Sequence, residues 1–196
     1  MRPTKSARTA LAIALSLWAG AITLHAQTQA IDAAKSTLTI RVFKSGLFSA
    51  FAHDHEIEAP IEKGLIDSSA NPAVQLQIDA RKLRVLDPES SADTRAEIER
   101  TMEGSTVLDT GHFPDISYQS TSVTKTSDAH WQVRGNLALH GTTHPIAVEV
   151  TLRDGHYVGS ASLKQSDFAI NPIRIAGGTV KIKDEIKIEF DIIPTQ

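Results

Sequence analysis

The residues with the greatest capacity for chemistry in this 196-residue chain are two histidines, His53 and His55, separated by one position. They lie in the segment 51–58, which reads Phe-Ala-His-Asp-His-Glu-Ile-Glu. On a β-strand, alternate side chains point to opposite faces, so both imidazoles share a face with Phe51 and Ile57 while the carboxylates occupy the other. Because Phe51 and Ile57 are apolar, we expect both histidines to point into the interior of the protein.

Two uses of this histidine pair follow from the residue types. The imidazoles can be core residues whose ring nitrogens are satisfied by neighbouring side chains or buried water. Alternatively, a His-x-His pair on one strand face supplies two nitrogen ligands, and a zinc site would need at least one more protein ligand. His112 and His144 are the candidates for that third ligand.

The elements that position these histidines are expected to be β-strands, because apolar and polar residues alternate along most of the chain after residue 27. Two alternating runs flank Gly141 within residues 131–152 and predict a tight hairpin. The run over 180–193 places large apolar residues at even positions and lysine or acidic residues at most odd ones. Such segments number about eight, which is enough for a closed antiparallel barrel with room inside for side chains or one small ligand.

One segment, 87–102, lacks this alternation and is rich in Glu, Ala, Arg and Ser. Asp87 is suited to cap a helix, Pro88 to take its first position and Gly104 to end it. A shorter helical turn is expected over residues 105–108. The sequence therefore predicts an all-β fold, an eight-stranded antiparallel barrel, with a short α-helical insertion across one end or side.

The first 26 residues have the pattern of a cleaved secretory signal peptide. Arg2, Lys5 and Arg8 precede an apolar run over 10–24, and Ala26 offers a cleavage site before Gln27. The apolar run is shorter than the roughly 20 residues that span a bilayer. We therefore expect a signal peptide at 1–26, one domain at 27–196, and an exported protein with no membrane span after cleavage.

Composition narrows the function classes. The formal charge changes from −3 to −6 when the three basic residues of the signal are removed, which disfavours nucleic-acid binding. The chain has no cysteine, so thiol chemistry and disulfides are excluded. It also lacks the nucleophile elbow, zinc-protease helix, phosphate loop and dinucleotide fingerprint. We expect a binding protein and not an enzyme, with no cofactor. The outward polar faces of the strands could form the interface of a homodimer.

Several motifs, taken in order, resemble one known family. Residues 137–145 fit the pattern L-x-L-H-G-x-T-x-P, residues 102–120 fit a block with M, L and then F-P-x-I-x-F-x-S, and residues 166–170 fit S-D-F-G-I with Ala169 in place of glycine. These are features of the YceI-like family of periplasmic, lipocalin-like, lipid-binding proteins. The resemblance covers about residues 30 to 194, whereas the segment 51–58 departs from the general family pattern.

The resemblance implies a periplasmic, lipocalin-like barrel that holds an isoprenoid or other long-chain lipid, for carriage or storage. It adds a third use for the two histidines, as hydrogen-bonding partners of the lipid's head group. A histidine-dependent metal-binding or stress-related barrel remains the rival function. Four further aromatic residues are candidates to line the cavity, although such residues are more often plain core. The expected ligand-binding residues are Phe51, His53, His55, Ile57, Tyr118, Trp131, Phe168 and Phe190.

Overall fold

The computed structural model of the chain describes residues 28–45, 54–175 and 180–195. Within these residues, twelve strands join into one antiparallel sheet, accompanied by one α-helix and two 3-10 turns. The elements are β1 (Thr28–Ala30), β2 (Thr37–Ser45), β3 (His55–Glu58), β4 (Ile61–Asp67), β5 (Ala73–Asp79), η2 (Ala80–Lys82), β6 (Arg84–Val85), α1 (Ala92–Glu103), β7 (Asp115–Ser127), β8 (His130–Leu139), β9 (Thr142–Arg153), β10 (His156–Lys164), η3 (Gln165–Phe168), β11 (Arg174–Ile175) and β12 (Val180–Ile192).

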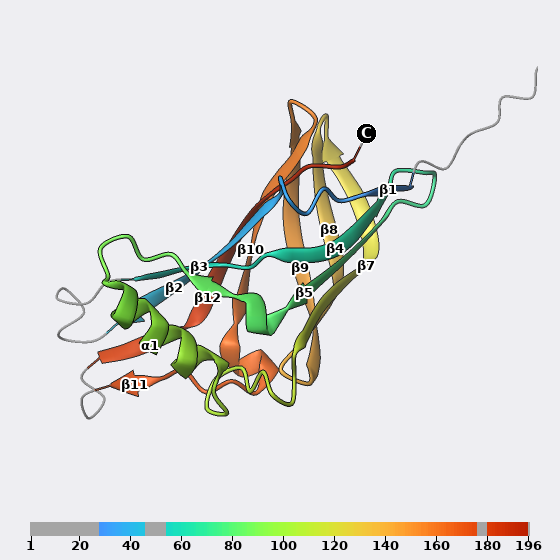
Figure 1. Cartoon of the computed structure of the whole chain (residues 1–196). Helices are drawn as coiled ribbons and strands as arrows, with labels where there is room; N and C mark the ends of the chain where they lie inside the picture. The colour runs from blue at the N-terminus through green and yellow to red at the C-terminus, as the bar shows by residue number, and fades with distance from the viewer. Residues whose placement is uncertain (1–27, 46–53, 176–179, 196) are drawn as a thin grey trace, which may run out of the picture.

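The sheet curls into a half-barrel (Figure 1). Its strands follow the order β1-β4-β5-β7-β8-β9-β10-β12-β2-β3-β6, with β11 paired to β12. A bridge between Ile31 and Pro194, with a 2.8 Å hydrogen bond from the Asp32 N–H to the Ile193 carbonyl, brings the chain after β1 against the end of β12. The helix α1 and the short strand β11 lie at the opposite end of the sheet (Figure 1).

The prediction of an all-β antiparallel fold with a helical insertion is confirmed, but the strand count of eight is wrong. Strands β1, β6 and β11 are only two or three residues long, too short to produce an alternating pattern. In addition, the chain bends between β3 and β4, so that β3 pairs with β2 and β6 while β4 pairs with β1 and β5.

The predicted helix exists but begins later than the sequence suggests. Its cap is Ser91, whose side chain accepts a hydrogen bond from the Thr94 N–H, and Gly104 closes its other end. Asp87 does not cap it, because its carboxylate bonds to β3 instead. Residues 105–108 form a turn and not a helix, so both of these boundary predictions are wrong.

The predicted strand registers position the interior correctly. In the β8–β9 hairpin, Trp131 pairs with Val150 and Val133 with Val148, and both pairs face inward. In β12, the apolar residues at even positions also face inward, namely Ile182, Ile186, Ile188, Phe190 and Ile192. Ile186 and the even-numbered residues after it point to the same side as Ile182, despite a bulge between Ile182 and Ile186. The inner face of the curled sheet is therefore continuous and apolar.

Candidate functional site

The curled sheet encloses a cavity of about 810 Å³. Its walls are aliphatic side chains from all of the longer strands, and α1 contributes Ile98 and Met102 at one end. Cavities that hold drug-sized or cofactor-sized ligands measure roughly 300–1,000 Å³ and are mostly apolar with a few placed polar groups. The volume and lining of this cavity fit an extended apolar ligand.

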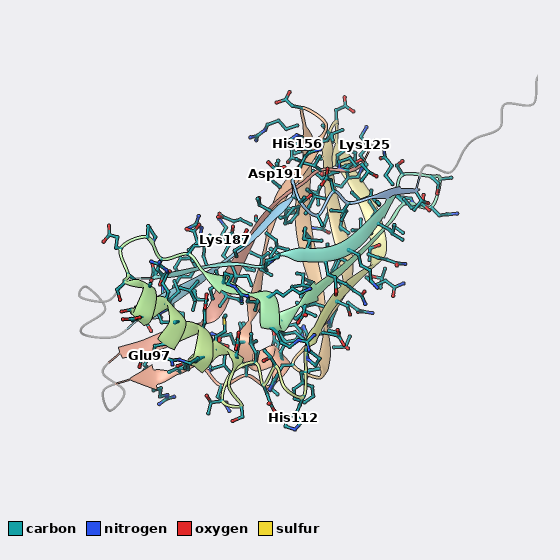
Figure 2. The ribbon with its side chains drawn as sticks, viewed as in Figure 1. Glu97, His112, Lys125, His156, Lys187 and Asp191 are labelled. Carbon is teal, nitrogen blue, oxygen red and sulfur yellow. The ribbon has the colours of Figure 1, made fainter. Side chains whose placement is uncertain are left out.

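The polar residues that line the cavity lie at its two ends. His55, Glu97, Thr101 and Gln165 occur at the end covered by α1, and Asp67 at the end of β4 with Ser68 and Ser69 of the β4–β5 turn occur at the other. Figure 2 shows Glu97 on α1, far from His156 and Asp191 at the opposite end of the sheet. Apart from the Tyr118 hydroxyl, which donates to the Val133 carbonyl, the middle of the cavity is apolar, so a ligand's polar group is accommodated only near an end.

His55 and Asp87 form a buried pair at the α1 end. The Nδ1 of His55 lies 2.6 Å from Oδ2 of Asp87, and the backbone N–H of Glu56 donates to Oδ1 at 2.8 Å. Only 5% of the Asp87 side chain is exposed and 16% of the His55 side chain. Because an ionised carboxylate only accepts, Nδ1 carries the proton of this bond. The orientation of the imidazole and its tautomer are therefore fixed by Asp87.

His55 also borders a second, smaller pocket of about 240 Å³ on the outer side of β3. This pocket is lined by Arg41, Phe43, Asp54, His55, Glu56, Asp87, Pro88, Glu89 and Ser90. Burial lowers the pKa of nearby Lys44, and the charges of Asp87 and Asp54 oppose that effect. The imidazole thus stands between an apolar cavity and a charged surface pocket, where a head group would meet water.

Tyr118 places a hydroxyl within the apolar wall. Its OH donates to the Val133 carbonyl at 3.4 Å, and burial raises its pKa to about 12, so the phenol is neutral. The ring lies over Gly135, where a Cβ would be 2.5 Å from Cζ of the tyrosine. Phe190 covers Gly159 in the same way. Glycine at these two positions lets the aromatic rings lie against the sheet instead of filling the cavity.

Five of the eight predicted binding residues line the cavity, namely His55, Ile57, Tyr118, Trp131 and Phe190. Phe168 is fully buried in the main core cluster, where its ring packs edge-on against His144, and it is not among the cavity-lining residues described. Phe51 and His53 lie outside the described residues. Sequence reasoning missed the bond of Asp87 to His55, because Asp-Pro before a segment rich in Glu, Ala, Arg and Ser matches a helix start.

The structure does not bring His55 together with either candidate third metal ligand, His112 or His144. Within residues 28–45, 54–175 and 180–195, no group of three or more His, Asp or Glu side chains is placed to hold a metal ion. His112 is exposed and bonds to Asp109, which raises its pKa. His144 contacts the Phe168 ring. Neither histidine forms such a group with His55.

The relation of the chain to known proteins agrees with this architecture. A model of the YceI-like domain matches residues 20–193. The chain belongs to the YceI-like family. Among its relatives, a UPF0312 protein of Vibrio parahaemolyticus is 28% identical over 200 residues, which cover 92% of this chain and 94% of that protein.

Solved structures share the YceI-like fold at low sequence identity. BcnA of Burkholderia cenocepacia has a TM-score of 0.64 at 18% identity, covering 83% of this chain and 98% of that one. A polyisoprenoid binding domain from Saccharophagus degradans has a TM-score of 0.51 at 14% identity, covering 85% and 97%. In the described part of this YceI-like chain, no helix is long and apolar enough to cross a membrane.

Proposed function

We propose that this protein binds a long-chain amphipathic lipid, of the isoprenoid class, inside its half-barrel, and carries or stores it in the periplasm without chemical change. The observation that carries the proposal is the apolar cavity of about 810 Å³, which ends at the His55–Asp87 pair. Membership in the YceI-like family and the shared fold of a polyisoprenoid binding domain support an isoprenoid as the ligand.

The chain of the lipid would dominate the affinity. Each methylene group removed from water contributes about 0.8 kcal/mol, although ordering of ligand and protein offsets much of the total. The fixed imidazole of His55 would add one hydrogen bond to the head group, on the order of 1 kcal/mol. Affinity should therefore rise with chain length, and the head group should mainly set the orientation.

Native mass spectrometry of the protein purified from the periplasm of its own cells tests the proposal. A stoichiometric mass of a long-chain lipid supports it, and N-terminal sequencing of the same sample should begin at Gln27 if the signal is cleaved as expected. A lipid-free protein with a stoichiometric metal ion would favour the rival metal-binding function. An intact N-terminal segment held in a membrane would overturn the periplasmic part of the proposal.

The His55→Gln variant tests the placement of the head group. It should weaken lipid binding about tenfold, equivalent to ~1.4 kcal/mol, and leave the fold intact. The matched control is His156→Gln, because His156 also bonds to an aspartate, Asp191, at 2.9 Å but does not line the cavity. Equal affinities for the two variants would show that the head group does not contact His55.

A further inference from the structure

The residues that line the cavity include exposed ones at two separate places. At the α1 end its lining includes the exposed residues Glu97 and Thr101. At the far end its lining includes Ser68 and Pro72, which are exposed residues of the β4–β5 turn. A cavity with one opening would be bounded at its inner end by buried residues. Here exposed residues bound both ends.

The path between these two places is long and apolar. On β12 it is lined by Ile182, Ile186, Ile188, Phe190 and Ile192. Because the bulge between Ile182 and Ile186 sets four steps of β12 against two of β2, this stretch spans about eight strand steps of ~3.3 Å, roughly 26 Å. Near the far end the wall includes Val74 and Trp131, so the apolar surface continues to the β4–β5 turn. The carboxylate of Asp67, the last residue of β4, accepts a 2.8 Å hydrogen bond from the Ser69 N–H of this turn.

We propose that the cavity is a channel open at both ends, and that the end of the ligand's chain leaves it beside the β4–β5 turn. This inference rests on the proposed function and names the ligand class more closely, as linear chains longer than the channel. The His55 end holds the head group, because the Asp87-oriented imidazole lies there, while the carboxylate of Asp67 is engaged within its own turn.

A channel and a closed pocket respond differently to chain length. In a channel, affinity rises until the chain fills the apolar path and then remains constant, because additional units lie in water. In a closed pocket, a chain longer than the cavity must fold back or leave its head group outside, so affinity falls. Polyprenols of three to nine isoprene units provide the length series, and titration of the purified protein measures each dissociation constant.

A plug at the second opening supplies a paired test. Pro72→Trp should weaken binding of the nine-unit polyprenol at least tenfold and change that of the three-unit polyprenol less than twofold. Asn71→Trp is the matched control, because Asn71 is exposed in the same turn but does not line the cavity. Asn71→Trp should change neither value. A fall in wild-type affinity for the longest chains, or equal effects of the two variants, would overturn the inference.

A direct measurement locates the chain end even if the tryptophan variants fail to fold. The chain has no cysteine, so a single Asn71→Cys or Glu89→Cys substitution can carry a nitroxide at one chosen end. A nine-unit polyprenol with a fluorophore at its chain end should be quenched by the nitroxide at position 71 and not at 89. The reverse pattern would overturn the inference. Failure of every polyprenol to bind would instead reject the proposed function.

Discussion

The buried His55–Asp87 pair predicts a large effect of one isosteric substitution, Asp87→Asn. The carboxylate accepts two hydrogen bonds, from His55 Nδ1 at 2.6 Å and from the Glu56 N–H at 2.8 Å. An amide has one acceptor oxygen, so either the His55 Nδ1–H faces an NH₂ group or the imidazole changes tautomer and its bond to a charged partner is lost. Hydrogen bonds to charged groups contribute about 1.5–3 kcal/mol, and an unsatisfied buried donor adds about 1–3 kcal/mol. We expect Asp87→Asn to lower the free energy of unfolding by about 2–4 kcal/mol.

The molecule contains a control for this substitution on its outer surface. His156 and Asp191 form the same kind of pair at 2.9 Å, but their side chains are 39% and 45% exposed. These residues lie at the end of the sheet opposite α1 (Figure 2). Because water can replace the lost partner there and exposed ion pairs are weak, Asp191→Asn should cost less than ~1 kcal/mol.

Urea denaturation at neutral pH, monitored by circular dichroism, measures the free energy of unfolding of both variants. A double-mutant cycle of Asp87→Asn with His55→Gln isolates the pair itself, and its coupling energy should be about 1–2 kcal/mol, against less than ~0.5 kcal/mol for Asp191 with His156. Similar losses for Asp87→Asn and Asp191→Asn would refute the view that burial makes this pair important. A coupling energy near zero would show that Asp87 does not orient His55.

Two further predictions concern the cavity wall and acid stability. Ile188→Ala, on the cavity wall, should lower the free energy of unfolding by about 1–2 kcal/mol without ligand and by more with ligand present. Phe168→Ala, at a fully buried core site, should lower it by about 3–5 kcal/mol. Equal losses for the two variants would contradict the presence of a cavity beside Ile188. The side-chain hydrogen bond from Arg81 lowers the pKa of Asp79 to about 2, below the usual ~3.9 of an unfolded chain. The contribution of the Asp79 carboxylate to folding stability is therefore complete above about pH 4 and is lost as the pH falls through 2. Between pH 5 and 2, the melting temperature should decline more steeply for the wild type than for Asp79→Asn.

The sequence alone determined the strand faces of this protein. Period-two alternation placed the apolar even residues of β12 and the paired residues of the β8–β9 hairpin inside, because a shift of one residue would expose the apolar set and bury lysines. The same alternation placed His55 and Ile57 on the inner face of β3, and both line the cavity. The ordered motifs also identified the family. These features are local, so the residues that specify them are neighbours in the chain.

Only the tertiary structure decided the composition of the polar end of the cavity. Asp87 is 32 residues from His55, and the sequence around it resembles a helix start. The Asp87 carboxylate bonds to β3 instead, because β6 pairs with β3. Leu86, which directly follows β6, donates its N–H to the Glu56 carbonyl and so brings Asp87 beside β3. The openings of the cavity were likewise not predictable. They depend on how twelve strands, several of them too short to show a pattern, curl around a common interior, and such long-range packing leaves no periodic signal in the chain.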